Sequence, residues 1–150
     1  ALDFRHPPLQ QFYAYWEGKR QDGALPFRDT VDPLDLRFVL GHVLLAEVVR
    51  GDSIRFRYRL WGSRLTEDYG AEMTGRFVDE LQPAAFGARV HRQYLNVVEA
   101  CTAQHDQFDD VIDGRWFIHE RLLLPLALRE APDRVGIVMG AIFRSPRLPP

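Results

Sequence analysis

The sequence predicts an α+β fold in which a five-stranded antiparallel sheet carries helices over one face. Three observations support this fold class. Apolar side chains alternate strictly along residues 54–61, which is typical of a half-buried strand. One apolar stripe with helical spacing runs along residues 83–102. Three further strand-like segments fill residues 105–144, so the long helix separates a pair of strands from a triplet.

The chain before the first strand is expected to be helical. One helix is predicted over residues 8–20 and a shorter one over residues 33–40, where Asp32 supplies a helix cap. We therefore predict a helical extension over residues 1–41 that forms one structural unit with a sheet domain over residues 42–146. The apolar stripe of the first helix has the i, i+3, i+4, i+7 spacing and consists of Leu9, Phe12, Tyr13 and Trp16.

Turn and loop residues divide the chain after residue 41 into separate strands and helices. A tight turn at 51–53 joins the first two strands as a hairpin, Asp113-Gly114 forms another turn, and a polar loop is expected at 129–134. The last strand is apolar on both faces, which predicts a central place in the sheet. The predicted elements are strands 42–50 and 54–61, short helices 63–69 and 77–82, the long helix 83–102, and strands 105–112, 115–127 and 135–144.

Composition places the chain among ordinary globular domains. The net charge of −2 gives no general electrostatic attraction to nucleic acid or to an anionic membrane. Cys101 is the only cysteine, which fits a reducing compartment, and no apolar run reaches the length of a signal peptide or a membrane span. Among 19 basic residues only Lys19 is a lysine, a usage typical of GC-rich bacterial genomes. We expect a cytoplasmic bacterial protein.

The order of elements and several motifs resemble the PAS domain family, in particular its small standalone alphaproteobacterial members. The order is two strands, short helices, a long helix and three strands. The resemblance implies a sensory or signalling module and carries over no catalytic residues. The matching motifs are Tyr13-Ala-Tyr15-Trp16, Asp32-Pro33, Phe56-Arg-Tyr-Arg-Leu-Trp-Gly-Ser63, Thr74-Gly75-Arg76 and Glu120-Arg-Leu-Leu-Leu-Pro-Leu126.

Cofactor markers known from such domains can be sought in this chain. Flavin-binding light sensors place a reactive cysteine just before a short helix, whereas Cys101 ends the long helix and reads as a small core residue. Haem-binding sensors take an axial histidine from the long helix, where His91 stands at the edge of the apolar stripe. We expect neither haem nor flavin, and the cofactor stays unknown. The histidines lack metal-ligand spacing, so no metal site is predicted.

An apolar pocket between the sheet and the helices is the predicted ligand site. Small molecules bind in cavities lined by aromatic side chains and a few polar groups. The alternative is a solid core built from the same residues, as in a pure protein-interaction module. The pocket candidates are Tyr58, Leu60, Leu65, Tyr69, Phe77, Val90, His91 and Tyr94.

Two surfaces are candidates for contacts with other molecules. Phe12, Tyr13 and Trp16 give the N-terminal helix more apolar area than a small domain readily covers, which favours a homodimer; packing within the chain is the alternative. Arg55, Arg57, Arg59 and Trp61 share a strand face, which could contact RNA or an acidic partner. Because no second basic element supports this, we favour a solvated face with arginines paired to acids.

The sequence therefore predicts a non-catalytic sensory or signalling PAS-like module that binds a small molecule or a partner protein. An enzyme on a cone-shaped α+β fold, with His91 or an aspartate as base, is the alternative from another class. Such folds begin with longer helices, and here the long helix follows the first hairpin, which disfavours them. No nucleic acid and no membrane partner are expected.

Overall fold

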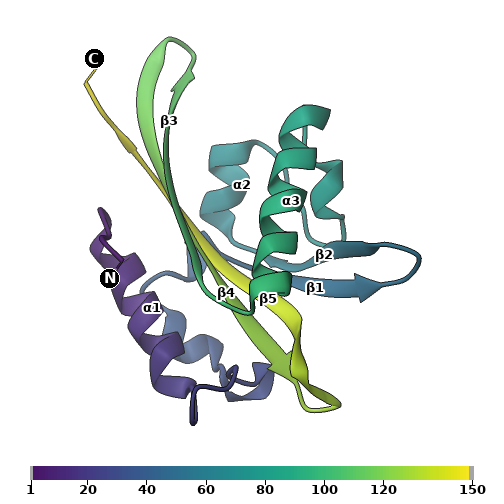
Figure 1. Cartoon of the computed structure of the whole chain (residues 1–150). Helices are drawn as coiled ribbons and strands as arrows, with labels where there is room; N and C mark the ends of the chain where they lie inside the picture. The colour runs from purple at the N-terminus through teal and green to yellow at the C-terminus, as the bar shows by residue number, and fades with distance from the viewer. Residues whose placement is uncertain (1, 149–150) are drawn as a thin grey trace.

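The computed structural model describes residues 2–148 and contains one five-stranded antiparallel sheet with strand order β2-β1-β5-β4-β3 (Figure 1). This confirms the predicted fold class and the central place of the last strand. The pairs β1–β2, β3–β4 and β4–β5 are hairpins, and β5 also pairs with β1 in the middle of the sheet. The strands are β1 (Val43–Arg50), β2 (Ile54–Trp61), β3 (Gln104–Ile112), β4 (Arg115–Leu128) and β5 (Ala131–Pro146).

Helices cover both faces of this sheet. We call the face packed against α2, η4 and α3 the inner face, and the face packed against α1 and the turns η1 to η3 the outer face (Figure 1). Among the described residues, no helix is both long and apolar enough to traverse a lipid bilayer. The helices are α1 (Pro7–Lys19), α2 (Ser63–Tyr69) and α3 (Ala84–Ala100), and the 3₁₀ turns are η1 (Arg28–Thr30), η2 (Pro33–Leu36), η3 (Leu40–His42) and η4 (Val78–Glu80).

Two predicted element boundaries were wrong. The expected helix 33–40 is two 3₁₀ turns, because Val39 leaves helical geometry and is buried against the outer face. The Asp32 carboxylate still caps the first turn by accepting from the Leu34 N–H at 3.0 Å. The expected loop 129–134 is only a two-residue turn, and β5 begins at Ala131. Polar residues extend the strand there because the end of the hairpin is exposed to solvent.

A β-bulge in β2 reverses the faces predicted for its last residues. Leu45 pairs with Leu60, but its neighbour Ala46 pairs with Tyr58, so Arg59 is an extra residue. The pattern of alternation therefore shifts by one position after Tyr58. Leu60 contacts the outer cluster, and Trp61 joins the inner one. The predicted assignments of these two side chains were wrong for this reason.

The aromatic stripe of α1 packs within the chain. Leu9, Phe12 and Trp16 are buried against the outer face of β4 and β5, and the Trp16 indole N–H donates to the Pro125 carbonyl at 2.9 Å. Tyr13 is only partly buried. The rings of Phe12 and Trp16 are therefore not available for contact with a second copy of the chain. The prediction that these two side chains form an uncovered apolar surface for a dimer was wrong. The homodimer itself stays a prediction, as does the domain boundary at residues 41 and 42.

A buried carboxylate fastens the segment before α1 to the sheet. Glu120, on the outer face of β4, is fully buried. Its Oε1 accepts from the His6 backbone N–H (2.7 Å) and lies 2.8 Å from His6 Nδ1. Its Oε2 accepts from the Arg5 backbone N–H (2.8 Å) and from the Gln107 side chain (3.2 Å), and lies 2.6 Å from His105 Nε2. Burial opposes ionisation of Glu120, but these hydrogen bonds outweigh it and lower its pKa.

Candidate functional site

A cavity of about 720 Å³ lies on the inner face, between α2 and α3 on one side and β3, β4 and β5 on the other. Sites for small molecules typically measure about 300 to 1,000 Å³, so this volume is sufficient for one. Exposed Gln82, Pro83 and Arg89 stand at its rim and open it to solvent. Six aromatic side chains contribute to the lining: Tyr58, Trp61, Tyr69, Phe86, Tyr94 and Phe108.

Five of the eight predicted pocket residues line this cavity and three do not. Those that line it are Tyr58, Leu65, Tyr69, Val90 and Tyr94. Leu60 faces the outer side because of the bulge. Phe77 lies beside β2 under the guanidinium groups of Arg55 and Arg57. His91 packs edge-on against Phe56, on the side of α3 that faces β2.

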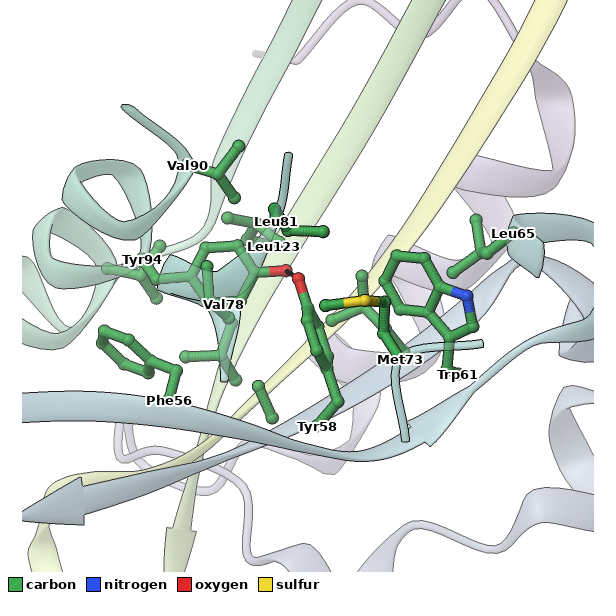
Figure 2. Close-up of a cluster of buried hydrophobic side chains, with 14 of the residues drawn as sticks. Phe56, Tyr58, Trp61, Leu65, Met73, Val78, Leu81, Val90, Tyr94 and Leu123 are labelled. Atoms are coloured by element: carbon green, nitrogen blue, oxygen red, sulfur yellow. Dashed lines mark hydrogen bonds between the residues drawn. The ribbon is translucent and has the colours of Figure 1, made fainter. Parts of the chain in front are cut away.

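Two buried tyrosines meet at the floor of the cavity. The Tyr58 hydroxyl from β2 and the Tyr94 hydroxyl from α3 lie 3.2 Å apart, and Figure 2 shows them pointing at each other. Burial raises the pKa of Tyr58 well above its ordinary value of 10.0, and burial also raises the pKa of Tyr94 against the opposing effect of Arg121. Both phenols are therefore protonated at neutral pH and can donate hydrogen bonds.

Arg121 is a charged group buried in the cavity wall. Its side chain projects from the inner face of β4 and retains only 6 % of its exposure. One guanidinium nitrogen donates to the Gln93 amide oxygen (2.5 Å) and to Asp106 Oδ2 (2.6 Å). Asp106 faces Arg121 directly across the β3–β4 pair, so the charge is compensated by a cross-strand partner. Its Nε–H is buried and has no hydrogen-bond partner among residues 2–148.

The opposite end of the cavity holds further polar groups. Arg144 of β5 pairs with Asp68 of α2 at 3.1 Å, which bridges the helix to the sheet. His119 of β4 stacks on Phe108 with ring centroids 4.8 Å apart. Its Nε2 is buried 3.8 Å from Asp110 and forms no hydrogen bond within the part of the chain that the structure describes. Burial lowers the pKa of His119, so its imidazole is neutral at neutral pH.

Close backbone approaches fix the helical wall of the cavity. A Cβ on Gly87 of α3 would lie 2.5 Å from the Leu81 carbonyl oxygen, so only glycine lets α3 pack onto the segment after η4. The hydroxyl of Tyr69 accepts from the Gln82 backbone N–H at 2.7 Å, which ties this segment to α2. The Trp61 indole N–H donates to the Ala71 carbonyl at 3.0 Å and holds the chain that follows α2.

Several polar residues of the lining were not predicted, among them Trp61, His119, Arg121 and Arg144. Trp61 was missed because of the bulge. The sequence could have indicated that Arg121 is buried, because Arg121 and its neighbour Glu120 directly precede an unbroken apolar run in a predicted strand. In such a strand one charge must face each covered side, and both then need partners. Those partners, such as Gln93 and Asp106, are too distant in sequence to be inferred.

The cysteine and the arginine strip lie outside the cavity. Cys101 caps the C-terminus of α3 and packs against the inner cluster, as predicted, and it does not line the cavity. Arg59 pairs with Glu47 on the neighbouring strand at 2.6 Å, and Arg55 pairs with Asp79 of η4 at 2.7 Å. These two arginines are paired with acids as we favoured, whereas Arg57 lies over the ring of Phe77. Within residues 2–148, no group of three or more histidine, cysteine or acidic side chains is arranged to hold a metal ion.

Two solved structures and one family model are similar to this chain. The LOV protein of Rhodobacter sphaeroides superposes with a TM-score of 0.50 at 13% identity, covering 91% of this chain and 67% of that chain. A domain of an HTR-like protein from Haloarcula marismortui gives a TM-score of 0.39 at 11% identity, covering 67% of this chain and 97% of that one. No curated protein sequence matches. A family model described as PAS domain matches residues 4–143, nearly the whole chain, and the chain therefore belongs to the PAS domain family.

Proposed function

We propose that this chain is a non-catalytic sensory PAS module that binds a small molecule in the cavity on the inner face of the sheet. The observation that carries the proposal is the cavity itself, about 720 Å³ in volume, with aromatic walls and buried polar groups that the chain leaves partly unbonded. This volume lies beside the packed inner cluster and opens to solvent, so a small molecule can enter it.

The charges of the cavity support binding rather than catalysis. Three of the four aspartates that line it are each paired with an arginine: Asp68 with Arg144, Asp106 with Arg121, and Asp109 with Arg147. The fourth, Asp110, is exposed and lies 3.8 Å from His119. A carboxylate oxygen that already accepts from a guanidinium group is not free to take a proton from a substrate. His91, the base considered for an enzyme, does not line the cavity.

The signal is proposed to pass to a partner protein in the cytoplasm, with the chain as a homodimer. The partly exposed ring of Tyr13 on α1 is what remains of the predicted dimer surface. Light scattering over a range of protein concentrations tests the dimer. A monomer mass at every concentration would contradict it and would leave ligand binding untouched.

Ligand binding is tested by an absorption spectrum and by native and denaturing mass spectrometry of the purified protein. We expect an additional small-molecule mass that denaturation removes, and a flavin or haem would show its own absorption band. Val90→Phe fills the cavity from α3 and should abolish this mass. Val98→Phe, on the same helix but outside the cavity lining, is the matched control and should retain it.

A chain that carries no ligand, and that is not stabilised against heat by any member of a diverse small-molecule panel, would overturn the proposal. A bound mass that survives Val90→Phe would place the ligand elsewhere and would overturn it as well.

A further inference from the structure

The buried floor of the cavity contains hydrogen-bond donors that the described residues leave unused. Two hydroxyl groups that bond to each other use only one of their two hydrogens, so the Tyr58–Tyr94 pair retains one O–H. Within residues 2–148 neither hydroxyl bonds to any other protein atom. Arg121 adds the unpartnered Nε–H. An unsatisfied buried donor is costly, so a ligand that accepts hydrogen bonds gains affinity here.

The two side-chain oxygens next to Arg121 already accept hydrogen bonds. The Gln93 amide oxygen and Asp106 Oδ2 both accept from the Arg121 guanidinium. Asp106 also accepts from the Gln104 side chain at 3.2 Å. The tyrosine oxygens can accept as well as donate, but the Arg121 Nε–H can only donate, so a ligand group must accept in order to satisfy it.

Charge distinguishes a neutral acceptor from an anion. The buried Arg121 cation is balanced by the Asp106 carboxylate at 2.6 Å. A carboxylate on the ligand would add a second negative charge to a pair that is already neutral, at the cost of its own desolvation. A carbonyl oxygen accepts the same hydrogen bonds without that charge.

The remaining lining suits a flat, apolar body. The rings of Trp61, Tyr69 and Phe86 line the cavity beside the apolar side chains of Leu65 and Val90. Aromatic rings pack favourably in stacked and edge-to-face arrangements with other rings. The site thus combines aromatic walls with a donor pair at its buried end.

We propose that the cavity selects a neutral, planar aromatic molecule whose carbonyl oxygen accepts hydrogen bonds from the Tyr58–Tyr94 pair and from Arg121. This inference rests on the proposed function and adds the chemical class of the ligand. It makes Tyr58, Tyr94 and Arg121 the residues that determine specificity.

Three probes of nearly the same shape test this class: acetonaphthone, ethylnaphthalene and naphthoate, substituted at the same ring position. Their dissociation constants for the full chain are measured by titration calorimetry at neutral pH. We expect the ketone to bind about tenfold more tightly than the hydrocarbon, which lacks the acceptor, and about tenfold more tightly than the acid.

The double variant Tyr58→Phe/Tyr94→Phe removes both hydroxyls together and leaves neither without its partner, so it should still fold. It should lose most of the ketone's advantage over the hydrocarbon. Tyr13→Phe, on the outer face, is the control and should preserve that advantage.

Equal affinity for ketone and hydrocarbon, tighter binding of the acid, or an unchanged ketone advantage in the double variant would each overturn the inference. If a probe other than the ketone binds more tightly and Val90→Phe abolishes its binding, the inferred ligand class is wrong. The proposed function, binding of a small molecule in this cavity, then still stands. Failure of all three probes to bind also overturns the inference, and the mass measurement described above then decides the proposed function separately.

Discussion

Replacing Glu120 with glutamine should destabilise the fold although it changes only one atom. Both carboxylate oxygens accept from a main-chain N–H, Oε1 from His6 and Oε2 from Arg5. A glutamine amide has one oxygen and one NH₂ group, which donates. Whichever way the amide is turned, one main-chain N–H must face another donor in a site that is fully buried.

The magnitude follows from these contacts. One unsatisfied buried N–H costs about 1 to 3 kcal/mol, and the other hydrogen bonds weaken by roughly 1 kcal/mol when the acceptor loses its charge. We expect Glu120→Gln to lower the free energy of unfolding by about 3 kcal/mol. In a chain of this size that corresponds to a fall in Tm of roughly 6 to 12 °C.

Urea unfolding at neutral pH, followed by far-ultraviolet circular dichroism, measures this change. The matched control is Glu67→Gln on α2, where the glutamate side chain is 71% exposed and lies 4.0 Å from Arg64. The control should stay within about 0.5 kcal/mol of the wild type. A Glu120→Gln protein that is equally close to the wild type would refute the reasoning, because the carboxylate would then not be needed to hold the N-terminal segment.

Three further results are expected. Because the folded-state pKa of Glu120 is lowered from 4.5, the ionised carboxylate contributes its full stabilisation above pH 4.5, and this stabilisation is lost as the pH falls through the folded-state pKa. The difference in unfolding free energy between wild type and Glu120→Gln should therefore shrink in acid. A difference that stays constant with pH would contradict this. Gly62→Ala should lower the free energy of unfolding by about 1 to 3 kcal/mol, because the added Cβ would lie 2.1 Å from the Gly41 carbonyl oxygen. Gly18→Ala is the control and should not destabilise, because its Cβ would meet nothing within 4 Å. Equal urea midpoints for the two variants would refute the steric argument. Phe12→Ala should lower the free energy of unfolding by about 3 to 5 kcal/mol at every protein concentration, because Phe12 is buried within the chain. A destabilisation seen only at concentrations at which the chain self-associates would instead place Phe12 in an interface between two copies.

The fold was predictable because its signals are local. The alternation along residues 54–61 and the stripe along 83–102 arise from burial of one side of each element, which a single segment records. The apolar residues on both faces of β5 also implied that both faces are covered. Two covered faces require two sets of helices, and the aromatic stripe of α1 could supply the second set. The packing of Phe12 and Trp16 against the outer face could therefore have been inferred from the sequence.

The candidate site was only partly predictable because its decisive features are not local. The bulge at Arg59 arises from the pairing of β2 with β1, and nothing in the alternation of β2 reveals the extra residue. It moved Trp61 into the inner cluster and Leu60 out of it. The hydroxyl pair of Tyr58 and Tyr94 joins residues that are 36 positions apart, so its hydrogen-bond count required the folded chain.

The central claim is that a small molecule occupies the cavity on the inner face, and methyl-resolved NMR of the full chain tests it most directly. On titration with acetonaphthone, the methyl signals of Leu65, Leu81 and Val90 should shift together and saturate. The methyl signals of Leu9 and Leu124, buried on the outer face, should stay unchanged. Shifts confined to the outer face, or none in the cavity methyls with this probe or with a ligand released from the purified protein, would contradict the account.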